Sequence, residues 1–261
     1  MGRIGPVLGG TVVLIYGFIL LPLVVILGVS FNPTARLDFP PTGLSLRWYD
    51  TLLHQPQFLN ALLTVSLPVG VGSAICSTIL GTLAALGLVR YQFPGRDALQ
   101  AATLLPLVVP HILLGASLYL WFANLGFSAS IGTLIIGHIL ISTPYVIRTV
   151  AAGLVGLDPS IEDAARDLGA GRIRCFFEVV VPQLRSSLIS GAIFALIVSF
   201  SDINIALFVS GPETTTLPVY LFSKIQWESD PSVAAASAGQ IIVIGFIILL
   251  LQKVFRARVG R

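Results

Sequence analysis

Long apolar windows without charged residues alternate with short polar segments along this chain. The five windows are Val7–Val29, Ala61–Val89, Ala98–Ile147, Ser186–Ser201 and Ser232–Gln252. A helix needs about 20 apolar residues to cross a bilayer, so the third window is long enough for two helices with a turn near Asn124. The fourth window continues past one acid, Asp202, to Ser210. The pattern predicts an all-α membrane protein with six transmembrane helices, at about residues 7–29, 61–88, 98–121, 129–147, 187–209 and 232–252.

The composition agrees with a membrane protein, and the distribution of basic residues predicts its orientation in the membrane. The chain is 55% hydrophobic and 10% charged, whereas soluble domains carry about 25% charged residues. Twelve Lys and Arg side chains, from Arg3 to Arg261, fall on one side of the predicted layout, and only Arg36, Arg47 and Lys224 fall on the other. Basic residues mark the cytoplasmic side, so both termini are predicted to be cytoplasmic. No basic stripe with interleaved aromatic residues points to nucleic acid.

The layout predicts four parts. Residues 1–30 form a peripheral transmembrane helix, which we expect to be retained because no small-residue cleavage pattern follows its long apolar run. Residues 31–60 form an external loop with a short interfacial helix. Residues 61–252 form a core of five helices that includes a cytoplasmic segment, 157–182, and residues 253–261 form a basic tail. Three aromatic residues are predicted to lie at the membrane interface: Trp48, Tyr49 and Trp227.

The cytoplasmic segment reads as a short polar helix. Asp158 can cap its first turn and Pro159 can occupy its first position. Four small or apolar residues recur on one face at helical spacing: Ile161, Ala164, Ala165 and Leu168. Gly169 or Gly171 can adopt the left-handed conformation that ends a helix. This face either fits the groove of another protein or packs on the chain's own helices.

Several kinds of chemistry are missing from the sequence. It has no Gly-x-x-x-x-Gly-Lys-Ser/Thr, and neither of its two lysines follows a glycine. Any ATP and Mg²⁺ must therefore be bound by another chain. No His-Glu-x-x-His occurs, which removes the usual zinc-protease motif. Cys76 lies in a helix and Cys175 on the cytoplasmic side, so neither a disulfide nor a metal cluster is predicted.

One enzymatic interpretation rests on Ser117 and His138, in neighbouring predicted helices. A membrane serine protease could pair such a serine with a histidine that activates its hydroxyl. Leu118 offers no small residue for an oxyanion turn, however, and the pair lies in unbroken apolar sequence. The favoured interpretation is that Ser117 bonds its own backbone and that His138 is an interior hydrogen-bonding residue.

Polar and helix-breaking residues inside the spans mark a candidate pathway. Asp202 is the one carboxylate in a predicted span, near Ser201 and Asn204, and either contacts a cationic substrate or makes a capping or interhelical hydrogen bond. Pro110, beside His111, bends the third helix, and the Ser142-Thr-Pro-Tyr145 break interrupts the fourth. Broken membrane helices line protein or water rather than lipid. These residues either line a pathway or serve packing.

The cytoplasmic segment also resembles a family signature. Asp163-Ala-Ala-x3-Gly169, nine residues, and Val179-Val-Val-Pro182 are similar to the Glu-Ala-Ala-x3-Gly-x9-Ile-x-Leu-Pro motif of membrane subunits of binding-protein-dependent ATP-binding-cassette importers. Asp163, Val179 and Val181 replace the usual Glu, Ile and Leu, and Glu162 offers a longer carboxylate. The likeness extends to the spermidine/putrescine permease branch in three stretches: Arg90 to Arg96, the neighbourhood of Asp202, and Val209 to Pro218.

This resemblance implies a bacterial inner-membrane permease of the type I importer fold, similar to methionine importers. It implies that the segment is a coupling helix docked in a separate ATPase dimer, with contacts from Ile161, Glu162, Asp163, Ala164, Ala165, Leu168, Gly169 and Pro182. It further implies a second, sibling permease and a periplasmic solute-binding protein. Related branches carry ferric iron, phosphonates, sulfate or opines. An ion-coupled carrier or channel is the competing class, and it would carry several intramembrane ionisable residues and no docking element.

Overall fold

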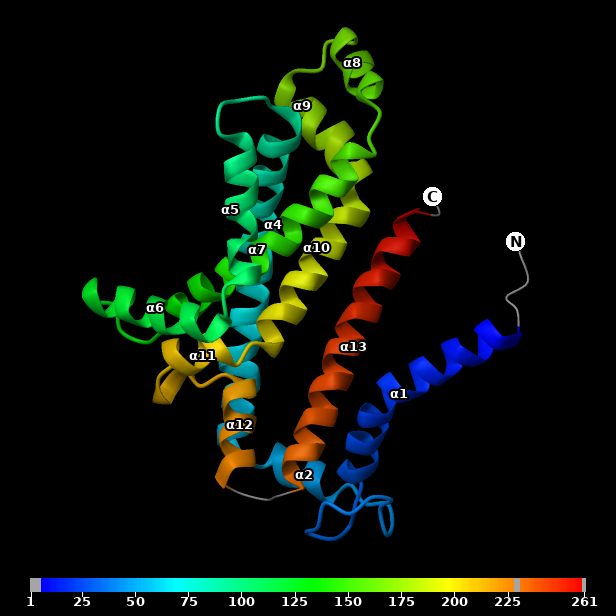
Figure 1. Ribbon diagram of the computed structural model, residues 1–261, viewed down its shortest axis with the longest axis vertical. Coiled ribbons are helices and arrows are strands. Elements are labelled where there is room, and N and C mark those ends of the chain that lie inside the picture. Colours follow the sequence, from blue (N-terminus) through cyan, green and yellow to red (C-terminus); the bar gives the residue numbers. More distant parts are fainter. Residues whose placement is uncertain (1–5, 228–230, 260–261) are drawn as a thin grey trace. The chain divides into compact units, whose positions relative to one another are not determined.

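A computed structural model describes residues 6–227 and 231–259, and within these ranges every regular element is a helix (Figure 1). Arg3 and Arg261, two of the basic residues used to assign the topology, lie outside the described residues. The elements in chain order are α1 Pro6–Ser30, α2 Arg47–Leu53, α3 Pro56–Leu59, η1 Asn60–Ser66, α4 Leu67–Arg90, α5 Arg96–Val108, α6 His111–Asn124, α7 Ile131–Val155, α8 Pro159–Asp167, α9 Arg172–Cys175, η2 Phe176–Val180, α10 Val181–Ser201, α11 Asn204–Val209, η3 Pro212–Thr214, α12 Leu217–Trp227 and α13 Ser232–Val259.

Several of these helices are long and apolar enough to cross a membrane. Four candidate spans are Leu8–Ser30, Pro56–Arg90, Ile131–Val155 and Arg172–Ser201. The bent pair α5 and α6 makes up to five spans if it is counted as one, and Ser232–Phe246 is a shorter apolar helix. The multi-pass helical architecture is therefore confirmed, whereas the count of six spans and the cytoplasmic termini stay predictions.

The helix expected at 98–121, with a bend at its prolines, is two helices in the structure. α5 ends at Val108 and α6 starts at His111, with an angle of 102° between them. Val109 is extended, at φ −70° and ψ 131°, because the ring of Pro110 disfavours the helical conformation of the residue before it. Pro110 also lacks an N–H to donate into the preceding turn. The predicted bend is thus a full break in the span.

The helix expected at 187–209 is wrong in its limits. Helical structure starts earlier, at Arg172, and runs through the π-helical stretch η2 into α10. It ends at Ser201, since Asp202 is extended with ψ 126°, and a separate short helix, α11, follows. A polar residue therefore interrupts the span where the apolar pattern predicted continuity.

Contacts divide the chain into two compact units, and the second comprises Asn60–Val219 with Ile248–Arg261. Its centre is formed by α4, α7 and α10, which pack on one another. Val146 of α7 is fully buried between Gly81 of α4 and Gly191 of α10. A Cβ on Gly81 would lie 2.7 Å from the Val146 side chain. Glycine at such crossings lets helix backbones approach closely, which is how membrane helices gain packing energy.

The first unit comprises Met1–Leu59 with Tyr220–Ile247. Trp48 of α2 is buried, and its indole Nε1–H donates to the Asn32 carbonyl at 2.8 Å. Tyr49 shares a hydrogen bond of 2.7 Å with Ser30, the last residue of α1. This indole therefore fastens the loop after α1, and its position at the membrane interface stays a prediction. Trp227 is exposed.

Candidate functional site

Helix α8 begins and ends as its sequence predicts. The backbone N–H of Ser160 donates to Oδ1 of Asp158 at 3.0 Å. This hydrogen bond lowers the pKa of Asp158. Gly169 is left-handed, with φ 87°. The N–H groups of Gly169 and Ala170 donate to the carbonyls of Arg166 and Ala165, the two bonds that close a helix end around a left-handed residue.

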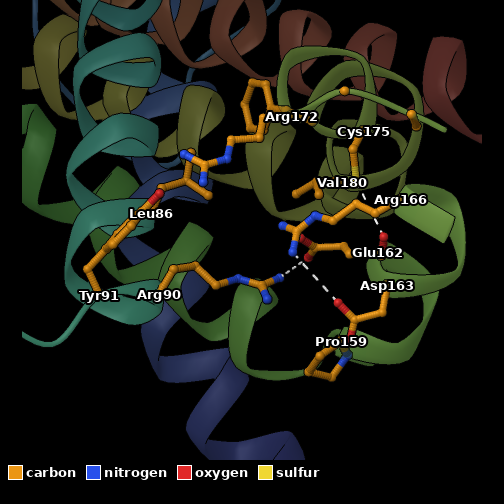
Figure 2. Close-up of a pocket in the computed structure, with 13 residues that line it drawn as sticks. Leu86, Arg90, Tyr91, Pro159, Glu162, Asp163, Arg166, Arg172, Cys175 and Val180 are labelled. Atoms are coloured by element: carbon orange, nitrogen blue, oxygen red, sulfur yellow. Dashed lines mark hydrogen bonds and ion pairs between the residues drawn. The ribbon is translucent and has the colours of Figure 1, made fainter.

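The acids at 162 and 163 differ in exposure and in their partners. The Glu162 side chain is 12% exposed and forms an ion pair with Arg90, the last residue of α4. Asp163 is 70% exposed, and its carboxylate lies 3.6 Å from Arg166. Arg166 also reaches Glu162, at 3.7 Å. Figure 2 shows the guanidinium groups of Arg90 and Arg166 turned toward Glu162, and the more exposed carboxylate of Asp163 turned toward Arg166.

The small and apolar residues of α8 do not all share one environment. Ile161, Ala164 and Leu168 are exposed, and Leu168 reaches 91%. Ala165 is half-buried on the side of Glu162. The predicted face therefore splits into an inner side and an exposed stripe with a spacing of three and four residues. Pro182 is exposed at the second position of α10.

A second group of polar side chains surrounds Asp202, and all but His111 are buried. We call it the Asp202 cluster: Asp202, His111, His138, Ser199 and Ser73. Oδ2 of Asp202 accepts from the N–H groups of Ile205 and Ala206, at 2.9 and 3.3 Å, and so caps α11. Oδ1 lies 3.6 Å from Nδ1 of His111, and Oδ2 lies 4.0 Å from Nε2 of His138. Asp202 is therefore a helix cap, as one of the two sequence interpretations held, and it is also the centre of a buried ionisable group.

The serines of this cluster complete the surroundings of His138. Nδ1 of His138 and Oγ of Ser199 are 2.6 Å apart, and the hydroxyl of Ser73 on α4 reaches Ser199 at 3.0 Å. Nε2 of His138 is buried without a hydrogen-bond partner among the described residues, and it faces Asp202. The predicted role of His138 as an interior hydrogen-bonding residue is confirmed. Its partner is Ser199 and not the exposed Ser117, so His138 does not pair with the serine on which the protease interpretation rested.

A close crossing brings His111 to Asp202. A Cβ on Gly115, one turn after His111 on α6, would lie 2.8 Å from the Asn204 carbonyl and 3.0 Å from Cα of Ile205 on α11. Only a residue without a side chain allows the two backbones to approach this closely. The crossing therefore sets the distance between α6, which carries His111, and α11, which Asp202 caps.

The other predicted pathway residues are not among the five that make up this cluster. Asn204 and Pro110 are exposed, at the starts of α11 and α6. Tyr145 lies two turns beyond His138 on α7, and its ring stacks on Phe194 at 6.3 Å between centroids. Ser201, expected beside Asp202, is exposed and bonds the Ile197 carbonyl. Sequence reasoning missed Ser199, although its spacing of three residues from Asp202 is a helical signal.

The described cysteines form no disulfide. Cys76 and Cys175 are free thiols. Within residues 6–227 and 231–259, His, Cys, Asp and Glu side chains do not converge in threes as they would around a metal ion.

Comparison with known proteins identifies the family. Residues 77–261 match the family described as binding-protein-dependent transport system inner membrane component. The putrescine transport system permease protein PotI of Escherichia coli (strain K12) is 37% identical over 248 residues, which cover 90% of this chain and 88% of PotI. The spermidine/putrescine transport system permease protein PotC of Haemophilus influenzae is 28% identical over 242 residues, 93% of each chain. The sulfate transport system permease protein CysT of Salmonella typhimurium is 29% identical over 244 residues, 88% of this chain and 87% of CysT.

Solved structures give the same fold. A bacterial alginate ABC transporter, in complex with its alginate pentasaccharide-bound periplasmic protein, matches with a TM-score of 0.71 and 15% identity, over 94% of this chain and 91% of that one. A second structure, of a bacterial ABC transporter for alginate import, matches with a TM-score of 0.64 and 16% identity, over 97% and 98%. At these identities the likeness concerns the fold alone.

The family match covers most of the chain, including α8, and the match to PotI covers nine tenths of it. The resemblance noted from Asp163 to Pro182 is thus confirmed. The helical, multi-pass architecture agrees with an inner-membrane transport component. This chain belongs to the binding-protein-dependent transport system inner membrane component family, and it is an ABC importer permease near the spermidine/putrescine branch.

Proposed function

We propose that this permease forms half of a pathway for a polyamine of the putrescine or spermidine class. A periplasmic solute-binding protein would deliver the solute, and a sibling permease would form the other half. The observation that carries the proposal is the 37% identity to a putrescine permease over 90% of the chain.

The Asp202 cluster supplies chemistry that suits a cation. A carboxylate that is 3% exposed within a membrane-spanning unit attracts an ammonium group strongly, because a low dielectric weakens screening. His111 is 30% exposed and lies beside Asp202, so it would stand between the carboxylate and an arriving solute. Asn204, Pro110 and Tyr145 remain candidates for other parts of the pathway.

Coupling to ATP hydrolysis would use α8. In this proposal α8 lies on the cytoplasmic side and docks its exposed stripe, Ile161, Ala164 and Leu168, in a separate ATPase dimer that binds ATP and Mg²⁺. Asp163 is exposed and would face that partner, whereas Glu162 is already paired within this chain. ATP-driven closure of the dimer would then move α8 and open the bundle outward.

Another solute is the alternative, since the sulfate permease CysT is 29% identical. A buried carboxylate disfavours an anion such as sulfate or phosphonate, because like charges repel strongly where water is excluded. This observation favours a cation over those solutes.

Uptake into proteoliposomes tests the proposal. The permease would be purified with the products of its neighbouring reading frames and reconstituted with ATP inside and the binding protein outside. We expect ATP-dependent uptake of radiolabelled putrescine or spermidine and none of sulfate. Uptake of sulfate, or of neither polyamine, would contradict the proposed solute. Failure of an ATPase subunit to co-purify would contradict the coupling role of α8.

A further inference from the structure

Helix α8 stands over an open cavity at the end of its unit. None of the described residues Pro159–Asp167 is buried. A cavity of about 840 Å³ separates α8 from the end of α4, with Arg90 and Tyr91 on one side and Pro159 and Glu162 on the other (Figure 2). Apolar packing therefore does not fix α8 to α4.

The ion pair between Arg90 and Glu162 crosses this cavity. The side chains of Arg90 and Glu162 are 26% and 12% exposed. A comparable pair on α9 and η2, Arg174 with Glu178, is 70% and 60% exposed. Partial burial reduces the solvent screening that makes surface pairs weak. The thiol of Cys175 also lies 3.9 Å from the Glu162 carbonyl, so this residue is held through its backbone as well.

The covalent connections of α8 lead to other helices. α8 is joined to α7 through a linker with Gly156 and to α9 through Gly169 and Gly171. Glycine gives such linkers more conformational freedom than other residues would. α4 is distant in sequence, so a displacement of α8 reaches it through non-covalent contacts.

α4 leads from this ion pair into the Asp202 cluster. Its last residue is Arg90, and its Ser73 is hydrogen-bonded to Ser199, the partner of His138. The two positions lie about 25 Å apart along a helix of this length. α4 is thus a rigid connection between the α8 end of the unit and the buried ionisable group.

We propose that Arg90 and Glu162 are positioning residues that make α4 follow the movement of α8. The ion pair is a strut: it holds α8 at a fixed distance from α4 across the cavity, so that force applied to α8 is passed to the helix that contacts the Asp202 cluster. This inference rests on the proposed function, in which α8 docks in a separate ATPase.

The test uses the complete importer in proteoliposomes. Arg90→Gln and Glu162→Gln each remove one charge, the double variant Arg90→Glu with Glu162→Arg reverses the pair, and Arg174→Gln removes an exposed charge as the control. Three quantities are measured: co-purification of the ATPase, ATPase stimulation by the loaded binding protein, and solute transported per ATP hydrolysed. The last two separate coupling from assembly.

We expect both single variants to retain the ATPase and to lose transport per ATP by at least about fivefold, the lower range of coupling between sites. The reversed pair should recover most of the loss, and Arg174→Gln should match the wild type. Single variants that behave like Arg174→Gln, or a reversed pair that assembles and stays uncoupled, would overturn the strut.

A covalent cross-link in place of the ion pair tests the proposal if the variant with the reversed pair does not assemble. Arg90→Cys with Glu162→Cys would be joined by a short bifunctional maleimide. Coupling should be low before the cross-link and recover after it, and a cross-linked protein that stays uncoupled contradicts the proposal. If the wild-type chain binds no ATPase, the proposed function fails. If the wild type couples and the variants do too, only the strut fails.

Discussion

Oδ1 of Asp202 lies 3.6 Å from Nδ1 of His111, although the two residues are far apart in sequence. Each belongs to a break in an apolar span: His111 follows Pro110, and Asp202 separates α10 from α11. The two breaks therefore meet and form a polar site. Both lie in segments that hydropathy alone would assign to continuous membrane-spanning helices.

Two substitutions of Asp202 distinguish the effect of its charge from its structural role as a helix cap. Asp202→Asn should lower polyamine uptake at least about tenfold, because an amide lacks the charge that attracts an ammonium group. The Asn oxygen can still accept from the N–H of Ile205, so the fold should persist. Asp202→Ala should in addition lower stability by about 1–2 kcal/mol, since the cap of α11 is lost. Uptake and thermal unfolding in detergent measure the two effects, and unchanged uptake by Asp202→Asn would assign this residue to structure alone.

The α4–α7 crossing should not accept a single added methyl group. In Gly81→Ala the new Cβ would lie 2.7 Å from the Val146 side chain, and overpacking of this kind costs about 1–3 kcal/mol. Gly87→Ala, on the same helix, meets nothing within 4 Å and is the matched control. It should be neutral or stabilising by up to about 1 kcal/mol, the helix preference of alanine over glycine. Equal melting temperatures for the two variants would contradict the close crossing.

The end of α8 requires glycine at one of two nearby positions. Gly169 has φ 87°, so Gly169→Ala should destabilise the helix end by about 1 kcal/mol, although its Cβ meets nothing within 4 Å. Gly171 has φ −64° and equally open space, so Gly171→Ala should be tolerated. Amide exchange at Gly169 and Ala170, whose N–H groups close the helix, measures the difference. A bulky residue at 169 should also reduce ATPase stimulation if α8 docks closely in its partner, and equal exchange in the two alanine variants would argue against the strained position.

The start of α8 should depend on pH. The hydrogen bond from Ser160 lowers the pKa of Asp158 below its ordinary value of 3.8. Since the folded-state pKa is the lower one, the cap stabilises α8 at neutral pH, and this contribution is lost as the pH falls through the folded pKa. The Ser160 amide resonance should therefore shift at acidic pH. The same titration of Asp158→Asn, which keeps an acceptor but no proton to gain, should show no such transition, and an identical shift in both proteins would contradict the cap.

The local features of α8 could be predicted from sequence because they depend on neighbouring residues. Asp158 caps the helix and Gly169 ends it, as expected, since these interactions span a few residues only. The apolar windows likewise predicted most helices, because each must bury or shield its backbone within one segment. The turn near Asn124 was found for the same reason.

The tertiary structure decided which polar groups meet. Nothing local says that Glu162 rather than Asp163 turns toward Arg90, or that Ser199 rather than Ser117 bonds His138. Trp48 is of the residue type that anchors chains at membrane interfaces, yet its indole is buried within its unit and donates to the carbonyl of Asn32. Sequence by itself determined the helical membrane architecture and the α8 segment, because hydropathy and capping act along the chain. The Asp202 cluster and the Arg90–Glu162 strut required the fold, because long-range contacts depend on how helices pack and not on the pattern of any one of them.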